Sequence, residues 1–145
     1  MEEELTFKSF LVFMKSAKSV QERIKHEMSK YNLGLSDFSV LDALYHNGKQ
    51  NIQQIISNQV FHASSTMTYI IDKLENKGWI NRIDCHEDGR VVYVSITEQG
   101  RLLMEKVMPH YRKVIQDIFQ EINIEEKKMM ISMLNRVDQK ESLNF

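Results

Sequence analysis

The chain has 145 residues, of which 42% are hydrophobic and 27% charged, and its formal net charge is -1 at pH 7. This length and composition predict one globular domain over residues 1–145, and the counts of five Gly and one Pro exclude a fibrous or collagen-like chain. Because acidic and basic residues almost balance, binding to nucleic acid would depend on locally placed groups and not on bulk charge.

The sequence favours a reducing, cytoplasmic location. No apolar run approaches the roughly 18–20 residues that span a bilayer. The acidic start at Met1–Glu4 does not resemble a signal peptide. Cys85 is the one cysteine in the sequence, so no intrachain disulfide can form. We expect a cytoplasmic protein without a cofactor.

Apolar spacing predicts helices over the first half of the chain. A long amphipathic helix is expected over about residues 6–31, with Thr6 as its N-cap and a broad apolar face that suggests burial against a partner chain. Ser36 is expected to cap a shorter helix, which Gly48 ends. After a very short helix, a fourth helix is expected over about residues 63–76. The last two helices outline a helix-turn-helix.

Two β-compatible segments, Trp79–Ile83 and Val91–Thr97, follow these helices. The polar, turn-rich segment Asp84–Arg90 separates them, which predicts a β-hairpin with an extended tip. A hairpin directly after a helix-turn-helix is typical of a winged helix-turn-helix, here expected over about residues 36–97.

Helical spacing returns over about residues 98–140. Thr97 is expected to cap the first helix of this part, and Pro109 is expected to kink or split it. Asn123 and Glu126 form a capping-box-like start to a last helix. The expected fold class is therefore mainly α with a small β-hairpin wing.

The predicted fourth helix has two unlike faces. Apolar residues at Met67, Ile70, Ile71 and Leu74 predict a face toward the core. The candidate DNA-binding residues around the opposite face are mostly short and carry hydroxyl groups: Ser64, Ser65, Thr66, Thr68, Tyr69 and Lys73. Such side chains let a helix lie deep in the major groove, with its positive dipole end toward phosphates. Because the same residues are good helix caps, a plain surface helix remains an alternative.

The ordered motifs L-E-x-x-G, R, D-x-R and I-T-x-x-G, in register between Leu74 and Gly100, resemble those of the MarR family of transcriptional regulators. The resemblance covers essentially the whole chain. It implies a homodimeric regulator of transcription that binds double-stranded DNA, most often a repressor released by a small aromatic or phenolic effector. It also implies that the long N- and C-terminal helices form the dimer interface, and that the operator is a pseudo-palindrome with half-sites about 10 bp apart.

The resemblance assigns roles in the wing. Arg90 corresponds to the arginine that enters the minor groove, and Asp88 to the carboxylate that orients it. Gly89 replaces a second basic residue that many members carry. Arg82 either braces the hairpin or contacts phosphate, and the sequence leaves both readings open.

The resemblance also implies an effector pocket. Its candidate residues are aromatic or Met side chains that suit a flat apolar ligand, and they are equally compatible with an ordinary core: Phe10, Phe13, Met14, Phe38, Tyr45, Met108 and Tyr111. The segments Leu44–Gln50 and Asp84-Cys85 most resemble regulators of the MhqR type. That implies a response to quinone-like electrophiles.

Two alternatives remain at this stage. Cys85 could act as a redox or alkylation sensor, although its acidic neighbours Glu87 and Asp88 disfavour a thiolate. A winged-helix module that binds protein and not DNA is compatible with the near-neutral charge and with Gly89. The histidines show no metal-ligand spacing, and no motif of an enzyme occurs, so neither a metal site nor catalysis is expected.

Overall fold

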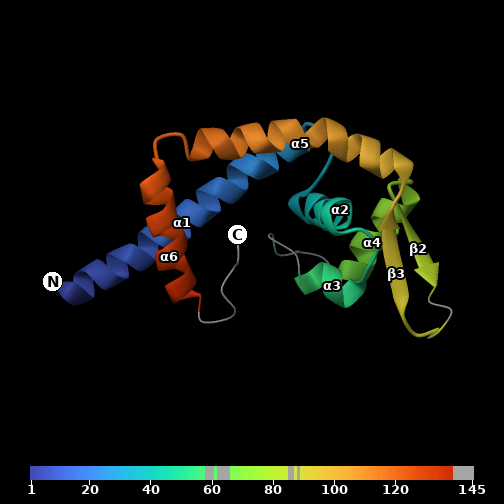
Figure 1. The fold of residues 1–145 in the computed structure, drawn as a ribbon, viewed down its shortest axis with the longest axis horizontal. Coiled ribbons are helices and arrows are strands. Elements are labelled where there is room, and N and C mark those ends of the chain that lie inside the picture. The colour runs from blue at the N-terminus through green and yellow to red at the C-terminus, as the bar shows by residue number, and fades with distance from the viewer. Residues whose placement is uncertain (58–60, 62–65, 85–86, 88, 139–145) are drawn as a thin grey trace. The chain divides into compact units, whose positions relative to one another are not determined.

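The computed structural model describes residues 1–57, 61, 66–84, 87 and 89–138. In these ranges it contains a helical framework and a small sheet (Figure 1). The helices and strands are α1 (Glu2–Ser29), α2 (Leu35–Asn47), β1 (Gln50–Asn51), α3 (Ile52–Ser57), α4 (Met67–Asn76), β2 (Ile80–Asp84), β3 (Val92–Ile96), α5 (Glu98–Ile118) and α6 (Ile124–Val137). The prediction of a mainly helical fold with a winged helix-turn-helix is confirmed.

The chain forms two compact units, Met1–Val114 and Ile115–Phe145. The core of the first unit joins the C-terminal part of α1 to the helix-turn-helix, the sheet and α5. Its fully buried side chains include Met28, Phe38, Leu41, Leu44, Ile55, Ile70, Ile71, Leu74, Ile80, Val94 and Met104. The second unit contains the end of α5 and the whole of α6. Within the part of the chain that the structure describes, no helix is long and apolar enough to cross a membrane.

The sheet has three antiparallel strands in the order β1-β3-β2. The expected hairpin is present, since β2 pairs with β3 from Ile80 opposite Ile96 to Asp84 opposite Val92. The sequence did not reveal β1, in which Gln50 lies opposite Val94. Two residues are too few for the alternation that identifies a strand. The consequence of this third strand is that the wing is hydrogen-bonded to the segment just before α3.

The predicted caps of the first two helices are wrong. Thr6 lies inside α1, which begins at Glu2, and its hydroxyl donates to the carbonyl oxygen of Glu2 at 3.0 Å. Acidic residues in the first turn suit the positive end of the helix dipole, so the helix extends from Thr6 toward the N-terminus. Ser36 lies inside α2, and the backbone N–H of Gly34 instead donates to the carboxylate of Asp37 at 3.0 Å.

The start of α4 and the continuity of α5 can also be compared with the sequence prediction. The α4 helix begins at Met67, because Thr66 has an extended backbone and acts as the N-cap. The predicted start near residue 63 lies outside the described residues. Pro109 does not split α5, which is continuous from Glu98 to Ile118. The capping predictions for Thr97 and Asn123 are confirmed: the N–H of Gly100 donates to the hydroxyl of Thr97 at 3.1 Å, and Asn123 and Glu126 form a capping box.

Candidate nucleic-acid interface

The α4 helix presents one buried face and one exposed face. Ile70, Ile71 and Leu74 have at most 2% of their surface exposed, whereas Tyr69 is 59% exposed. Thr66 and Thr68 are exposed as well. The hydroxyl oxygen of Thr66 accepts the N–H of Tyr69 at 3.3 Å, so the threonine caps the helix and also stands at its positive end. The first turn of α4 is therefore a polar surface directed away from the core.

The second half of α4 is held to the wing by one arginine. The backbone N–H and Nη1 of Arg82, on β2, donate to the two carboxylate oxygens of Glu75 at 3.0 and 2.8 Å. Its Nη2 donates to Asp72. Hydrogen bonding to Asp72, together with the bond to Glu75, raises the pKa of Arg82 above its ordinary value. Arg82 thus braces the hairpin against α4, which was one of its two predicted roles.

A lysine links the same helix to α2. The Nζ of Lys73 lies 2.9 Å from Oδ2 of Asp37, and the Asp37 side chain is 4% exposed. The two residues are 36 positions apart, so this ion pair is a tertiary contact between α2 and α4. Lys73, one of the predicted DNA-binding residues, therefore has a partner within the protein, as does its neighbour Asp72.

The end of α4 forms a tight turn that leads directly into the wing. The N–H of Gly78 donates to the carbonyl of Glu75 at 2.9 Å, and the N–H of Trp79 to that of Leu74 at 3.1 Å. This is the Schellman pattern, which needs a left-handed residue, and Gly78 has φ +80°. The hydroxyl of Thr97 donates to the carbonyl of Gly78 at 2.6 Å and ties the start of α5 to this turn.

Several motif residues therefore build the frame of the wing. Together, the contacts of four motif residues join α4, the hairpin and α5: Glu75, Gly78, Arg82 and Thr97. These positions fix where the hairpin leaves the helix. In the D-x-R motif, by contrast, Gly89 and Arg90 are exposed.

The described part of the wing places Arg90 near the start of α3. A shallow pocket of about 260 Å³ is lined by Asn51, Ile52, Gln53, Arg90, Val91 and Val92. A Cβ on Gly89 would meet no atom within 4 Å, so this position is open. Ser64, Ser65, Cys85 and Asp88, which the sequence analysis singled out, lie outside the described residues.

Comparison with known proteins decides the family. A family model described as "Transcriptional regulator SarA/Rot" matches residues 22–107. The HTH-type transcriptional regulator MhqR of Bacillus subtilis (strain 168) is 34% identical over 134 residues, covering 92% of this chain and 92% of that protein. The chain belongs to the SarA/Rot family of MarR-type winged-helix transcriptional regulators.

Solved structures of MarR-type regulators share the fold. Sco3205, a MarR family regulator from Streptomyces coelicolor solved in complex with DNA, has a TM-score of 0.81 at 17% identity, with 94% of this chain and 85% of that chain covered. BpsR of Bordetella bronchiseptica, whose DNA binding is regulated by 6-hydroxynicotinic acid, has a TM-score of 0.78 at 19% identity, with 90% and 92% covered. The predicted membership of the MarR family is confirmed.

The residues predicted for the effector pocket of the regulator fall into two groups. Phe38 and Met108 are buried in the core, and the ring of Tyr111 lies 4.6 Å from that of Phe38. Burial, and then the nearby charge of Asp42, raises the pKa of the Tyr111 phenol. Tyr45 is half-buried.

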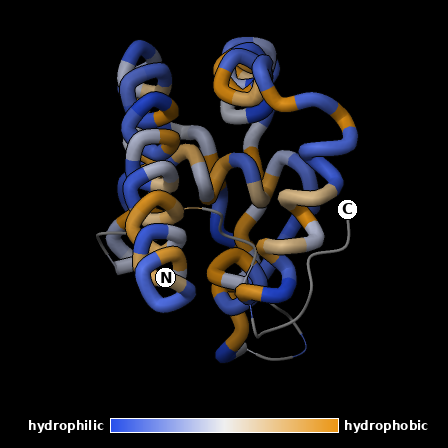
Figure 2. The backbone as a smooth tube through the Cα atoms, turned by 90° about the vertical axis from the view of Figure 1, so that its left-hand side faces the viewer, coloured by the Kyte–Doolittle hydropathy of each residue, from blue (hydrophilic) through white to orange (hydrophobic). Residues whose placement is uncertain are grey.

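The second group lies on α1, where Phe10, Phe13 and Met14 are 58%, 43% and 51% exposed. Apolar residues recur along this part of the helix (Figure 2). They are surface side chains in the single chain, so the structure does not bring them together with Phe38, Tyr45, Met108 and Tyr111 as one enclosed pocket.

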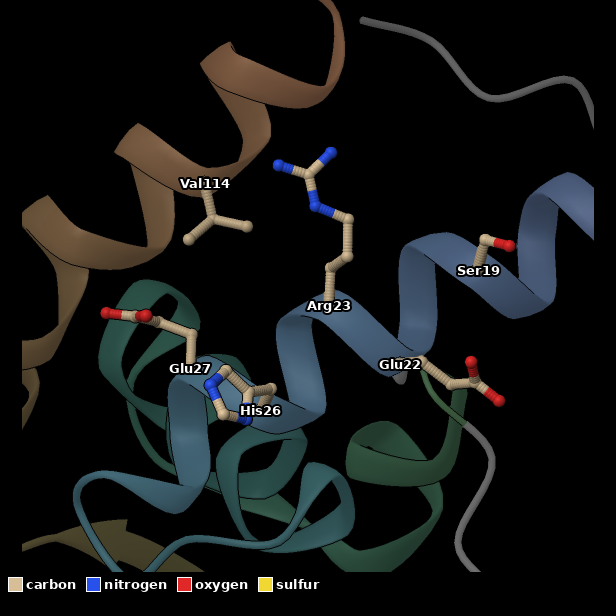
Figure 3. A pocket seen from close by; sticks show the side chains of 6 residues that line it. All are labelled: Ser19, Glu22, Arg23, His26, Glu27 and Val114. Atoms are coloured by element: carbon tan, nitrogen blue, oxygen red, sulfur yellow. The ribbon is translucent and has the colours of Figure 1, made fainter.

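The structure also shows a groove that sequence reasoning missed. It lies between α1 and α5, has a volume of about 520 Å³ and is lined by Ser19, Glu22, Arg23, His26, Glu27 and Val114 (Figure 3). Arg23 extends from α1 toward Val114 on α5 (Figure 3). The lining carries charges of both signs and is mostly exposed. Apart from Val114, its residues stand on the polar side of the long N-terminal helix, and no sequence pattern distinguishes them from ordinary solvated residues.

Proposed function

We propose that this regulator reads DNA with the first turn of α4 in the major groove and with the wing in the minor groove. The observation that carries the proposal is the exposed polar surface formed by Thr66, Thr68 and Tyr69, opposite the buried face of the same helix. Short hydroxyl side chains at the start of a recognition helix reach base edges and phosphates. The complex of Sco3205 with DNA supports this use of the shared fold.

Arg90 is the proposed contact of the wing. It is exposed, and a guanidinium group is attracted by the negative potential of a narrow minor groove. The full set of residues proposed to lie at the DNA is Ser64, Ser65, Thr66, Thr68, Tyr69, Asp88, Gly89 and Arg90. Of these, Ser64, Ser65 and Asp88 lie outside the described residues.

We propose that the regulator is a homodimer. The N-terminal half of α1 exposes seven large apolar residues, each between 43% and 62% exposed: Leu5, Phe7, Phe10, Leu11, Val12, Phe13 and Met14. In the second unit α6 exposes Ile124, Met129, Ile131, Met133, Leu134 and Val137. Soluble monomers rarely expose apolar surface of this extent, whereas a two-fold partner would bury it and would place two α4 helices on a pseudo-palindrome.

We further propose that a small aromatic or quinone-like effector releases a repressing dimer from DNA. The likeness to MhqR and to BpsR, whose DNA binding is regulated by 6-hydroxynicotinic acid, supports a regulator of this kind. Tyr45 and Tyr111, half-buried beside the core, are the proposed hydroxyl partners of the effector. Phe10, Phe13 and Met14 would complete the pocket only where the dimer interface covers them.

Selection of genomic DNA fragments by the purified protein tests the function. We expect fragments that share a pseudo-palindrome, and an Arg90→Ala variant that binds them more weakly by about 1–3 kcal/mol. Failure to enrich any fragment, together with unchanged weak DNA binding in Arg90→Ala, would instead favour a winged-helix module for protein partners.

The dimer is tested by light scattering after size-exclusion chromatography. A Phe10→Glu, Phe13→Glu double variant should become monomeric, because it introduces two charges into the proposed apolar interface. A Lys8→Glu variant at an exposed polar position of the same helix should remain dimeric. A wild-type protein that elutes with the mass of one chain would contradict the proposal.

A further inference from the structure

Lys73 stands on the recognition helix of a DNA-binding protein, and the obvious role for its ammonium group is a contact with phosphate. Its surroundings argue otherwise. The Nζ atom lies 2.9 Å from Oδ2 of Asp37, and that same oxygen accepts the backbone N–H of Gly34 at 3.0 Å. Asp37 is 3% exposed. A carboxylate so far removed from water depends on the charge of its partner.

The free-energy cost of moving the Lys73 ammonium group to a phosphate is larger than the cost for an unpaired surface lysine. If Lys73 turned toward a phosphate, the buried Asp37 would lose its countercharge and keep the backbone N–H of Gly34 as a hydrogen-bond donor. The Lys73 side chain is itself 38% exposed, but Asp37 is buried, and leaving a buried carboxylate without its countercharge is unfavourable. A surface lysine without such a partner gains a phosphate at almost no internal cost. The ammonium group is therefore held by the protein.

The pair also has a position from which it controls the DNA-binding surface. Asp37 lies in the first turn of α2, and Lys73 lies four residues beyond Tyr69 in α4. On the neighbouring side, Arg82 of β2 holds Asp72 and Glu75 of α4. Two ion-paired contacts from two different elements thus restrain α4 in addition to its buried apolar face, and the rotation of the helix about its axis decides where Thr68 and Tyr69 point.

We propose that Lys73 is a positioning residue that acts through Asp37 to orient α4, and that it makes no contact with the DNA backbone. This inference rests on the proposed role of the α4 surface. It assigns to Lys73 a role unlike the direct contact with DNA that was predicted from its place in the sequence. It also removes one positive charge per chain from those available to phosphates.

The first test needs no DNA. The variants Asp37→Asn, Lys73→Met and their combination are unfolded with urea, and the double-mutant cycle gives the coupling between the two side chains. We expect the double variant to unfold at a midpoint close to that of the more sensitive single variant, and Lys73→Arg to recover most of the wild-type midpoint. Additive midpoint shifts would overturn the pair and hence the inference, whatever the protein binds.

The second test measures the salt dependence of binding to a fragment that the wild-type protein has selected from genomic DNA. The slope of log K against log salt is negative, and each phosphate contact adds about 0.9 to its magnitude. We expect Lys73→Met and Asp37→Asn to lose affinity alike, by about tenfold, with the wild-type slope retained. A slope smaller in magnitude by about 0.9 per bound chain in Lys73→Met would show a phosphate contact, and wild-type affinity in Asp37→Asn would show that the pair does not orient α4. Either result would overturn the proposal.

Arg90→Met serves as the matched control, since it removes one charge at a position where we do propose a DNA contact. The magnitude of its salt-dependence slope should decrease by about 0.9 per bound chain. An unchanged slope in Arg90→Met would count against the proposed function of the wing and leave the inference about Lys73 to the double-mutant cycle. The two failures are therefore distinguishable.

Discussion

The carbonyl oxygen of Trp79 lies 2.2 Å from the position that a Cβ on Gly100 would occupy. Residue Trp79 precedes β2, and Gly100 is in the first turn of α5, so the helix starts directly against the backbone that enters the wing. The same carbonyl accepts the N–H of Thr97 at 2.9 Å. The glycine of the I-T-x-x-G motif is therefore required by the close approach of two backbones and not by the chemistry of DNA binding.

Gly100→Ala should destabilise the fold for this reason. A methyl group would overlap with backbone atoms that cannot move without breaking the bond from Thr97, so we expect a loss of about 1–3 kcal/mol in the free energy of unfolding. Gly89→Ala is the control, because a Cβ there meets nothing within 4 Å. Urea unfolding of both variants checks the difference, and equal stability would show that α5 does not start where the structure places it.

The contact between Glu75 and Arg82 should matter more than an ordinary surface ion pair. Glu75 accepts two hydrogen bonds from Arg82, one of them from its backbone, so Glu75→Ala removes a joint between α4 and the wing. We expect a loss of about 1 kcal/mol in the free energy of unfolding and faster hydrogen exchange of the Arg82 amide. Glu105→Ala, which removes an exposed partner of Arg101 at 3.4 Å, should have almost no effect. Comparable losses in the two variants would contradict the assigned joint.

The apolar spacing of the chain was enough to predict most of its helices. Met67, Ile70, Ile71 and Leu74 repeat with the helical period, and the last three are buried as expected. Helix starts were less predictable, since Thr6 and Ser36 are good caps by type but lie inside helices. Caps depend on a local competition between hydrogen bonds that residue type alone does not decide.

Contacts between distant residues could not be predicted from the sequence. Nothing in the spacing of Asp37 and Lys73, which are 36 residues apart, indicates that they pair. Nor does the pattern around Gln50 indicate a strand, although it pairs with Val94. Both features depend on how the finished core brings elements together. For Lys73 the pairing changes the expected role, because its partner Asp37 can be identified only in the folded chain.

Thr68 and Tyr69 should determine base preference. Both are exposed on the first half of α4. Thr68→Ala and Tyr69→Ala should each weaken binding to a selected fragment by about 1–3 kcal/mol and leave binding to random DNA almost unchanged, because contacts to base edges carry the sequence information. Fluorescence anisotropy with both DNAs measures the ratio. Thr6→Ala, at an exposed threonine whose hydroxyl bonds its own helix, is the control. Equal losses on both DNAs would place base recognition elsewhere.

Cys85→Ser separates the proposed effector pocket from the alternative of sensing at the Cys85 thiol. A pocket lined by Tyr45 and Tyr111 binds its ligand without covalent chemistry, so we expect the variant to be released from DNA at the same effector concentration as the wild type. Release is measured with a benzoquinone, which alkylates thiols, and with the corresponding reduced phenol under anaerobic conditions. Because the chain has one cysteine, alkylation can occur at one thiol only. A variant that responds to neither compound, beside a wild-type protein that responds to the quinone alone, would establish thiol chemistry and exclude the pocket as the site of that response.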